Sequence, residues 1–324
     1  MQRAGPGQGR AWSAVHARLL FPRGPVLYDG EATRRNHKMT ERRWSGPFAH
    51  ELEKKSYLVI LNTAIKLGPD GGPNRVFELL WAGAARRICA DGGANRLYDY
   101  CMASAATGPD TRQQPPRILV PDHITGDLDS IRPQVKQFFE QSPAQISHHQ
   151  DQDSTDFGKC LALIDAIEGR SDSNNLYHHH STGLLLIHGG LTGRLDQTIH
   201  TLHVLLSPLR APSASPVHGL PETWVVDTDG GSMACALPGG VKHLLHVPVS
   251  WRQGGSPLTC GILPIGVNQT TLTTKGLKWN LDRAQSSMTG LLSTSNHVLP
   301  ETEVVEVESD ESVIWTIEIP SSAM

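Results

Sequence analysis

Between residues 57 and 206 the chain alternates short apolar runs with longer segments whose apolar residues recur at helical spacing. The first run, Tyr57 to Leu61, is continuously apolar, which is typical of a strand covered on both faces. Further runs lie at 87–90, 118–120, 144–147 and 184–187, and helical segments at 73–85, 131–140, 154–168 and 195–206. Because strands joined through helices run parallel, this half of the chain predicts an α/β/α fold, a parallel sheet with helices on both faces.

The pattern changes after residues 207–221, a stretch that contains four prolines. Beyond it, short runs rich in Val, Leu and Thr are separated by Gly, Pro and Asn, which predicts a small β-sandwich or barrel. We expect one strand at 277–281, and a closing hairpin formed by 304–307 and 313–319. The predicted domains are therefore an α/β domain at 57–215 and a β domain at 216–324.

Residues 1–56 lack hydrophobic periodicity and are rich in Arg, Gly and Pro, which predicts a mostly disordered basic extension. The first 28 residues carry arginines and no acid, as a mitochondrial transit peptide does. We favour the alternative, an upstream extension of no structural consequence ahead of Met39. The expected location is therefore the cytoplasm, with a mitochondrial form left open.

The rest of the chain is mildly acidic. Residues 1–43 hold nine Lys or Arg and three Asp or Glu, so they contribute +6 to a net charge of −3 and leave −9 for the remainder. An acidic body argues against nucleic-acid binding, which depends on basic side chains that neutralise phosphates. No apolar run approaches the roughly 20 residues of a membrane helix, so we expect a soluble protein without a membrane partner.

Acidic side chains follow four of the five predicted parallel strands. They are Asp91 after the second strand, Asp127 and Asp129 after the third, Asp153 and Asp156 after the fourth, and Asp196 after the fifth. In open parallel sheets, ligands bind beyond the carboxyl ends of the strands. Two charges about 4 Å apart repel by about 4 kcal/mol at an effective dielectric near 20, so such a cluster favours a bound cation. Carboxylate oxygens suit Mg²⁺, although a helix N-cap would also explain an isolated Asp129.

The same loops contain residues that suit phosphate. Gly92, Gly93, Gly190 and Gly193 allow backbone N–H groups to approach an anion closely. Arg194 and Lys159 can neutralise phosphate oxygens, although a surface ion pair and a solvated helix face explain them equally well when each is taken alone. The sequence has no G-x-x-x-x-G-K-[ST] motif and no G-x-G-x-x-G after the first strand, so it is neither a P-loop protein nor a typical dinucleotide binder.

Taken in order, six motifs resemble those of the thiamine pyrophosphokinase family, its animal form above all. They are DGGAN at 91–95, GDLDS at 126–130, DQDSTDF at 151–157, GGLTGRLDQ at 189–197, TKGLKWNL at 274–281 and STSN at 293–296. The resemblance extends from Tyr57 to Ile319. It implies an N-terminal α/β catalytic domain, a C-terminal β-sandwich, and a homodimer with active sites at the subunit interface. It also implies the reaction ATP + thiamine → thiamine diphosphate + AMP, with Mg²⁺ as the cofactor.

The clustering of these residues at strand ends, together with the resemblance, leads us to expect the following roles. Asp127, Asp129 and Asp156 are expected to hold Mg²⁺ and, with Arg194, to carry catalysis. The residues expected to bind ATP are Asp91, Gly92, Gly93, Asn95, Asp153, Thr155, Lys159, Gly190, Gly193, Asp196 and Gln197. The residues expected to bind thiamine are Trp279, Ser293, Ser295 and Asn296; for Trp279, packing in the β core is the alternative.

Two other functions remain open on the residues alone. One is a related Mg²⁺-dependent phosphotransferase or hydrolase that acts on another acceptor. The other is a non-catalytic nucleotide-binding protein that keeps the fold without turnover. The intact acidic and basic residues at 127, 129, 156 and 194 argue against the second of these.

Overall fold

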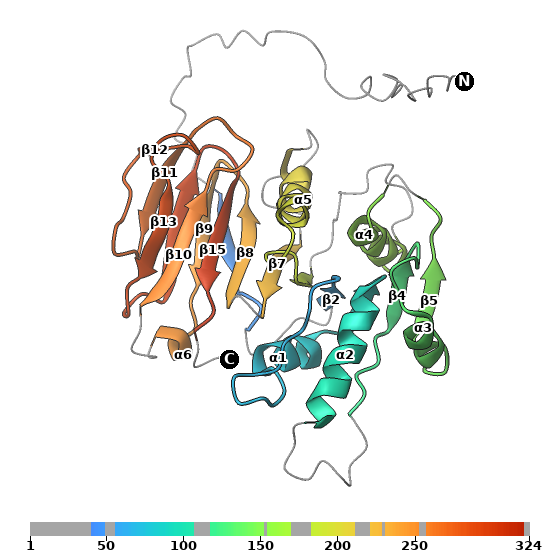
Figure 1. Cartoon of the computed structure of the whole chain (residues 1–324). Helices are drawn as coiled ribbons and strands as arrows, with labels where there is room; N and C mark the ends of the chain where they lie inside the picture. Colours follow the sequence, from blue (N-terminus) through green and yellow to red (C-terminus); the bar gives the residue numbers. More distant parts are fainter. Residues whose placement is uncertain are drawn as a thin grey trace, which may run out of the picture. The chain divides into compact units, whose positions relative to one another are not determined.

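The computed structural model describes residues 40–48, 56–106, 117–151, 154–169, 183–210, 221–228, 231–252 and 257–320. The chain divides into two units, Met1–Lys38 and Met39–Met324, and every described residue belongs to the second. Figure 1 shows that this unit has an α/β part, in which helices flank the strands, and a β-rich part next to it. Among the described residues, no helix is both long and apolar enough to cross a membrane.

One sheet of ten strands runs through this unit, in the order β13-β10-β15-β8-β7-β6-β2-β3-β4-β5. Its strands from β7 to β5 pair in parallel, as the alternating pattern predicts. The parallel strands are β2 (Ser56–Ile60), β3 (Arg86–Ala90), β4 (His123–Gly126), β5 (Gln145–His148), β6 (Leu184–His188) and β7 (Glu222–Asp227). The helices between them are α1 (Arg75–Gly83), α2 (Gly93–Ala106), α3 (Pro133–Glu140), α4 (Asp156–Ile167) and α5 (Leu195–Leu206), which continues into the 3-10 helix η1 (Ser207–Arg210).

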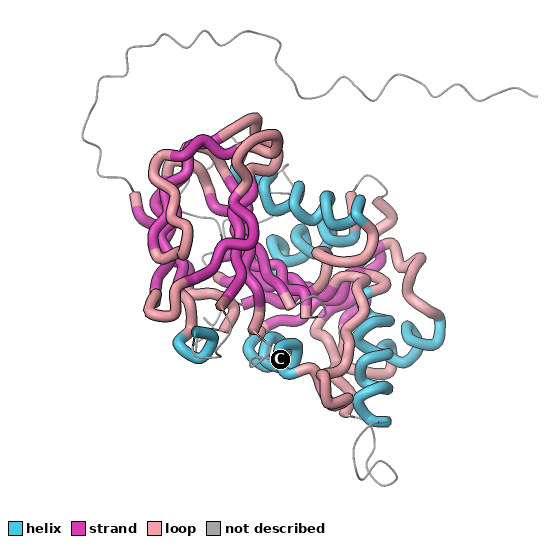
Figure 2. Tube along the Cα trace, turned by 60° about the vertical axis from the view of Figure 1, so that its left-hand side comes forward, coloured by secondary structure: helices cyan, strands magenta, loops and turns pink. Residues whose placement is uncertain are grey.

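The helices cover both faces of the parallel strands, and Figure 2 shows them on either side of the sheet. Successive residues of a strand point to opposite faces, so β2 contributes to two cores. Leu58 and Ile60 pack in the cluster that includes α1, α2 and α3, whereas Tyr57 and Val59 pack in the cluster that includes α4 and α5. Because both faces of β2 are buried, the predicted apolar run that starts at Tyr57 has no solvated position. The arrangement confirms the predicted α/β class.

The C-terminal part is β-rich, consistent with the β-sandwich that the sequence predicts. A five-stranded sheet, β1-β9-β14-β11-β12, shares one apolar core with the antiparallel end of the long sheet. The elements after β7 are β8 (Ser232–Leu237), β9 (Val241–His246), α6 (Val249–Arg252), β10 (Leu258–Leu263), β11 (Thr270–Lys275), β12 (Ala284–Ser286), β13 (Ser293–Val298), β14 (Val304–Ser309) and β15 (Val313–Glu318).

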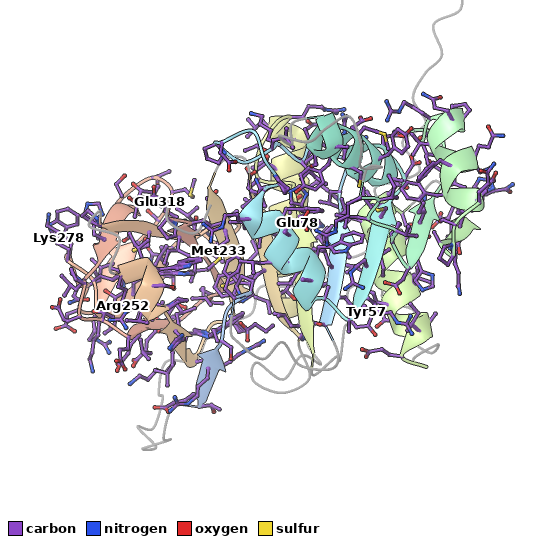
Figure 3. The ribbon with its side chains drawn as sticks, turned by 90° about the horizontal axis from the view of Figure 1, so that it is seen from below. Tyr57, Glu78, Met233, Arg252, Lys278 and Glu318 are labelled. Atoms are coloured by element: carbon purple, nitrogen blue, oxygen red, sulfur yellow. The ribbon has the colours of Figure 1, made fainter. Side chains whose placement is uncertain are left out.

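The long sheet continues from the α/β half into the β half without a break. β7 pairs in parallel with β6 and antiparallel with β8, so it belongs to the parallel strands although it follows residue 215. In Figure 3, Met233 of β8 lies between Tyr57 and Glu78 on one side and Lys278 on the other. The domain boundary at 215/216 remains a prediction, and the backbone hydrogen bonds of one sheet cross it.

Two predicted strands and one predicted strand pairing differ from the structure. The strand before GDLDS is not at 118–120 but is β4, which ends in the motif's own Gly126; Pro121 follows the apolar run and has no N–H for a ladder. Residues 304–307 and 313–319 do not form a hairpin, because β14 pairs with β9 and β11 whereas β15 pairs with β8 and β10. The segment 277–281 forms only an isolated bridge, at Leu277.

Part of the predicted disordered extension is an ordered strand. β1 (Glu41–Trp44) pairs in parallel with β9, and Trp44 is buried against Trp224 of β7 with ring centroids 6.0 Å apart. Trp44 Nε1 donates to Nδ1 of the buried His243 at 3.0 Å, and burial lowers the pKa of His243 to about 4. The extension prediction is therefore wrong for residues 40–48, and residues 1–39 lie outside the described part.

We expect Trp44→Ala to lower the free energy of unfolding by about 3–5 kcal/mol, because it removes a buried ring that joins the two sheets. Urea denaturation of the parent protein and of Trp44→Ala measures this difference. Trp279→Ala removes the same atoms from a side chain that is 53% exposed, and it should cost less than about 1 kcal/mol. Equal costs for the two variants would contradict the role assigned to β1.

Candidate active site

The carboxylate of Asp91, at the end of β3, holds the loop that follows β4. Asp91 is fully buried, and the backbone N–H groups of Ser130 and Ile131 donate to its two oxygens at 2.9 and 3.0 Å. Burial raises the pKa of Asp91, and these hydrogen bonds oppose that rise only in part. The side chain of Asn95 strengthens the junction, since its Nδ2 donates to the carbonyl oxygen of Ser130 at 2.8 Å. DGGAN and GDLDS are therefore one structural unit.

Three carboxylates of this unit converge. Ligand oxygens of Asp91, Asp127 and Asp129 lie within 4.8 Å of one another, a spacing that suits a single metal ion. Within the loop, the N–H of Asp129 donates to Asp127 Oδ1 at 3.3 Å. Partial burial works to raise the pKa of Asp127, but this hydrogen bond and the charge of Lys159 together bring it below its usual value. Asp127 is therefore ionised at neutral pH, as a metal ligand must be.

Asp156, the third predicted metal ligand, lies beside this group at the first turn of α4. A Cβ placed on Gly126 would come within 2.7 Å of Asp91 Cβ and 3.0 Å of Asp156 Oδ1. The absence of a side chain at 126 thus allows the loops after β3 and β4 and the start of α4 to meet. Thr155 is the N-cap of α4, and its hydroxyl accepts the N–H of Gly158 at 3.2 Å.

Lys159 supplies positive charge between the acids. Its Nζ lies 3.2 Å from Asp156 Oδ1 and 3.6 Å from Asp127 Oδ2, and the residue is only 5% exposed. A buried ammonium group is stable only where carboxylates compensate it. Lys159 therefore reduces the repulsion within the cluster and faces the predicted metal ligands, instead of lying on a solvated helix face.

The predicted glycines make close contacts that a side chain would prevent. A Cβ on Gly93 would lie 2.2 Å from the carbonyl oxygen of Ile60, and one on Gly92 would lie 2.4 Å from the side-chain nitrogen of Asn62. Gly190 has φ +88°, and its N–H donates to Thr63 Oγ1 at 3.3 Å. The loop after β2 thus lies between the two glycine turns. Sequence reasoning missed Asn62 and Thr63, because no acidic or glycine motif marks this loop.

Residues 193–197 of the GGLTGRLDQ motif lie at the start of α5, and they are exposed. Arg194 Nη2 lies 2.5 Å from Asp196 Oδ2, and this hydrogen-bonded pair raises the pKa of Arg194 and lowers that of Asp196. Gly193 has φ +91°, a backbone conformation that side chains disfavour. Among the described contacts, none joins Arg194 to the acidic cluster, and Gln197 is also exposed. Asp153 lies outside the described residues.

Trp279, the predicted thiamine platform, is exposed and held in position by its neighbours. Asn296 Oδ1 accepts the N–H of Trp279 at 3.2 Å, and Asn296 Nδ2 donates to the carbonyl oxygen of Trp279 at 2.8 Å. His297 and Lys278 flank the indole ring, with Lys278 Nζ 4.5 Å from its centroid. Because Asn296 is only 4% exposed, its observed role is to fix the Trp279 turn.

Ser295 borders a hollow of about 420 Å³ on the outer face of the β half. Ser295 has φ +54°, and its neighbour Thr294 also lines the hollow, together with Thr259, Thr316 and Glu318. Ser293 begins β13 and is 8% exposed. Trp279 does not line this hollow, so the predicted thiamine residues do not form one cavity within the described part of a single chain.

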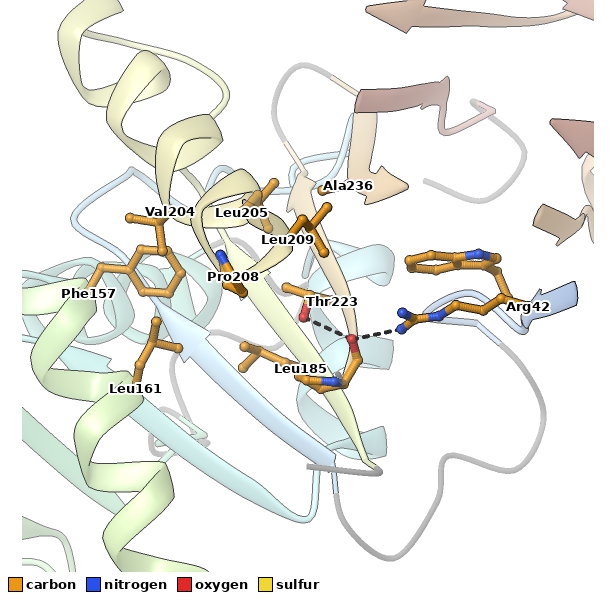
Figure 4. A pocket seen from close by; sticks show the side chains of 12 residues that line it. Arg42, Phe157, Leu161, Leu185, Val204, Leu205, Pro208, Leu209, Thr223 and Ala236 are labelled. Atoms are coloured by element: carbon orange, nitrogen blue, oxygen red, sulfur yellow. Dashed lines mark hydrogen bonds between the residues drawn. The ribbon is translucent and has the colours of Figure 1, made fainter. Parts of the chain in front are cut away.

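A separate cavity of about 50 Å³ is apolar (Figure 4). Phe157, Leu161, Val204 and Leu205 line it, and Arg42 at its edge donates to the carbonyl oxygen of Pro221 at 3.1 Å. None of the residues predicted to bind substrate or metal lines it. It is a gap in the core between α4 and α5 and not the site of chemistry.

The chain matches two family models, described as the catalytic domain of thiamin pyrophosphokinase, over residues 77–214, and its vitamin B1 binding domain, over residues 243–314. It is 36% identical to thiamine pyrophosphokinase 1 of Oryza sativa subsp. japonica over 249 residues, and the aligned region covers 76% of this chain and 83% of that protein. It is also 36% identical over 200 residues to thiamine pyrophosphokinase 3 of the same plant, covering 61% of this chain and 66% of that protein.

The chain belongs to the thiamine pyrophosphokinase family. It is therefore an enzyme of this type, a thiamine diphosphokinase, and neither alternative left open by the residues is favoured. The fold agrees with two solved thiamin pyrophosphokinases. The yeast structure has a TM-score of 0.66 at 24% identity, covering 88% of this chain and 92% of that one, and the Candida albicans structure has a TM-score of 0.65 at 22% identity, covering 87% and 93%.

The family's catalytic match begins in α1 and ends beyond η1, so it contains the acidic cluster. The vitamin B1 binding match begins in β9 and ends in β15, so it contains Trp279 and the STSN motif. The strands β2, β7 and β8 lie outside both matches, yet they form the middle of the shared sheet. The catalytic region and the vitamin B1 binding region are therefore connected through the backbone hydrogen bonds of one sheet.

We expect Gly126→Ala to destabilise the fold by about 1–3 kcal/mol, because the added methyl group overlaps Asp91. Denaturant unfolding measures the loss, and metal-dependent stabilisation should fall with it. Gly158→Ala is the matched control, since its Cβ would meet nothing closer than Thr155 Oγ1 at 3.6 Å. A Gly126 variant as stable as the Gly158 variant would contradict the close packing described here.

Proposed function

We propose that the chain transfers the diphosphoryl group of ATP to the hydroxyl group of thiamine at the acidic edge of its parallel sheet, with Mg²⁺ held by Asp91, Asp127 and Asp129. The observation that carries the proposal is the convergence of these three carboxylates within 4.8 Å at the carboxyl ends of β3 and β4. Asp156, beside them, would bind the ion directly or through water, as the sequence predicts.

The donor set fits magnesium. All of the grouped ligand atoms are carboxylate oxygens, the hard donors that Mg²⁺ prefers over the nitrogen and sulfur donors of zinc sites. When bound, the ion would neutralise charge on the phosphate oxygens of ATP. Asp91 has the further task of holding the GDLDS loop, because both of its oxygens already accept backbone N–H groups.

The other residues of this edge position ATP. Diphosphoryl transfer needs the acceptor hydroxyl in line with the β-phosphorus and compensation of the charge on phosphate, with little covalent help from the protein. Lys159 supplies buried positive charge, and the N–H groups near Gly92, Gly93 and Gly190 are suited to phosphate oxygens. Arg194 would have to leave its exposed pair with Asp196, and Gln197 and Gly193 lie in the same turn.

Thiamine would stack on Trp279. Its cationic ring system is attracted to an indole face by on the order of 1–2 kcal/mol. Asn296 and His297 hold the indole in a fixed place, and Ser293 and Ser295 lie on the same strand as these two residues, β13. The cation Lys278 near the same ring would have to move aside for the thiazolium group.

The proposed site requires a second copy of the chain. Eight strand-to-strand steps separate β13, which carries STSN, from β4, and at about 4.8 Å each they span about 40 Å. Reacting atoms must come within about 3.5 Å, so the two halves of one chain are too far apart to share a pair of substrates. A homodimer in which Trp279 of one copy faces the acidic edge of the other would solve this, as the family resemblance implies.

The location of the enzyme follows only from the sequence. We place it in the cytoplasm, with a mitochondrial form as the alternative if residues 1–28 direct import. These residues lie outside the described part of the chain.

Release of AMP from ATP that depends on thiamine is the direct test of the activity. We expect Asp127→Asn to lower kcat by at least about 100-fold at saturating Mg²⁺, because an amide cannot supply the negative charge the ion needs. The variant should also lose the rise in Tm that Mg²⁺ gives the parent protein. Asp310→Asn, in the exposed turn before β15, is the matched control. Turnover of the Asp127 variant within a few-fold of the parent enzyme would refute the assignment.

For Trp279→Ala we expect the KM for thiamine to rise by about tenfold, the equivalent of a lost cation–π contact, with the KM for ATP nearly unchanged. Steady-state kinetics with each substrate varied in turn measures both values. An unchanged KM for thiamine would remove Trp279 from the site.

A further inference from the structure

The first turn of α2 connects two loops of the catalytic edge through neighbouring side chains. Asn95 reaches the loop after β4, where its Nδ2 donates to Ser130. The next residue, Arg96, reaches the loop after β2 on the other side, and its Nε donates to Asn62 Oδ1 at 2.7 Å. Arg96 thus lies over the junction of the loops that follow β2 and β3.

The position of Asn62 shows how close Arg96 comes to the glycine turn. A Cβ on Gly92 would lie 2.4 Å from Asn62 Nδ2, so the Asn62 amide rests directly against the backbone of that turn. The guanidinium group is bound to this amide through Nε alone. Its two terminal NH₂ groups retain the fork geometry that suits a phosphate group.

Arg96 differs in charge balance from the other cations of this region. Lys159 is paired with two carboxylates, Arg132 with Asp99 at 2.5 Å, and Arg194 with Asp196. The hydrogen-bond partner of Arg96 is a neutral amide, and no carboxylate in the described residues lies within ion-pair distance of it. Its full positive charge is therefore available to an anion.

We propose that Arg96 is a phosphate-binding residue for ATP, held over the Gly92–Gly93 turn by Asn62. The proposal rests on the proposed function, which places the ATP phosphates at this edge. Arg96 would supply the accessible positive charge that the bound nucleotide needs, since Lys159 is already paired with two carboxylates. Arg194 then need not leave its pair with Asp196 for phosphate to be bound.

Binding of ATP and of adenosine to the full chain, in Mg²⁺ buffer without thiamine, tests the proposal. Calorimetry gives the ATP dissociation constant, and NMR titration gives that of adenosine, which has the same base and sugar but no phosphate. We expect Arg96→Gln to weaken ATP binding by about tenfold or more, the effect of losing a charge-assisted contact, and to leave adenosine binding unchanged. Arg96→Lys keeps the positive charge but loses the forked guanidinium group. Its ATP affinity should lie between those of the parent protein and Arg96→Gln.

Arg86→Gln is the matched control. Arg86 lies at the amino end of β3, away from the catalytic edge, and its partner Asp122 is also partly exposed. The variant removes the same net charge, so it should bind ATP as the parent protein does. If Arg96→Gln does not fold, the ratio of ATP to adenosine affinity in Arg96→Lys decides the question.

Two results would overturn the proposal. One is an Arg96→Gln protein whose ATP affinity stays within about threefold of the parent, a change smaller than one hydrogen bond to a charged group accounts for. The other is an equal loss for ATP and adenosine, which would mean that Arg96 acts only by holding Asn62. Thiamine-dependent release of AMP by the parent protein distinguishes these results from a failure of the proposed function. A parent protein without this activity would refute the proposed function. An active parent protein together with either result above would refute only the role of Arg96.

Discussion

Both oxygens of the Asp91 carboxylate accept backbone N–H groups from the loop that follows the neighbouring strand. A buried carboxylate is costly unless it is hydrogen-bonded, so this side chain and this loop depend on each other. The loop in turn carries Asp127 and Asp129, and the missing side chain at Gly126 brings Asp156 to the same place. Asp127 and Asp129 are therefore positioned through the loop that Asp91 holds, and Asp156 lies close to them because residue 126 has no side chain.

Charge balance explains the remaining polar residues of this edge. The acids repel one another, and buried Lys159 offsets part of that repulsion while leaving the cluster negative. A divalent ion would complete the compensation, and the phosphates it brings would require further positive charge, for which Arg96 is placed. The same sheet that builds this edge carries STSN about 40 Å away, and the Trp279 turn is bound to Asn296 of that motif, which is why the proposed reaction needs two copies of the chain.

Much of the fold and part of the site could be predicted from the sequence. Wholly apolar runs indicate strands covered on both faces, and β2 and β6 lie within a residue of the predicted positions. The predicted hairpin was wrong because alternation shows that a strand has a buried face but not which strand is its partner; β14 and β15 lie in different sheets. Asn62 and Arg96 were missed because their importance arises from contacts between loops and not from a motif.

By itself, the sequence determined the alternation of strands and helices, the acidic and glycine-rich motifs at strand ends, and the family to which the chain belongs. These are local features, since periodicity and short motifs are read from neighbouring residues. The tertiary structure alone decided that β7 joins the two halves, that Trp44 fastens β1 to the core, and that the Asp91 carboxylate holds the loop that carries Asp127 and Asp129. Strand pairing, burial and charge balance involve residues far apart in the chain, and only the folded structure brings those residues together.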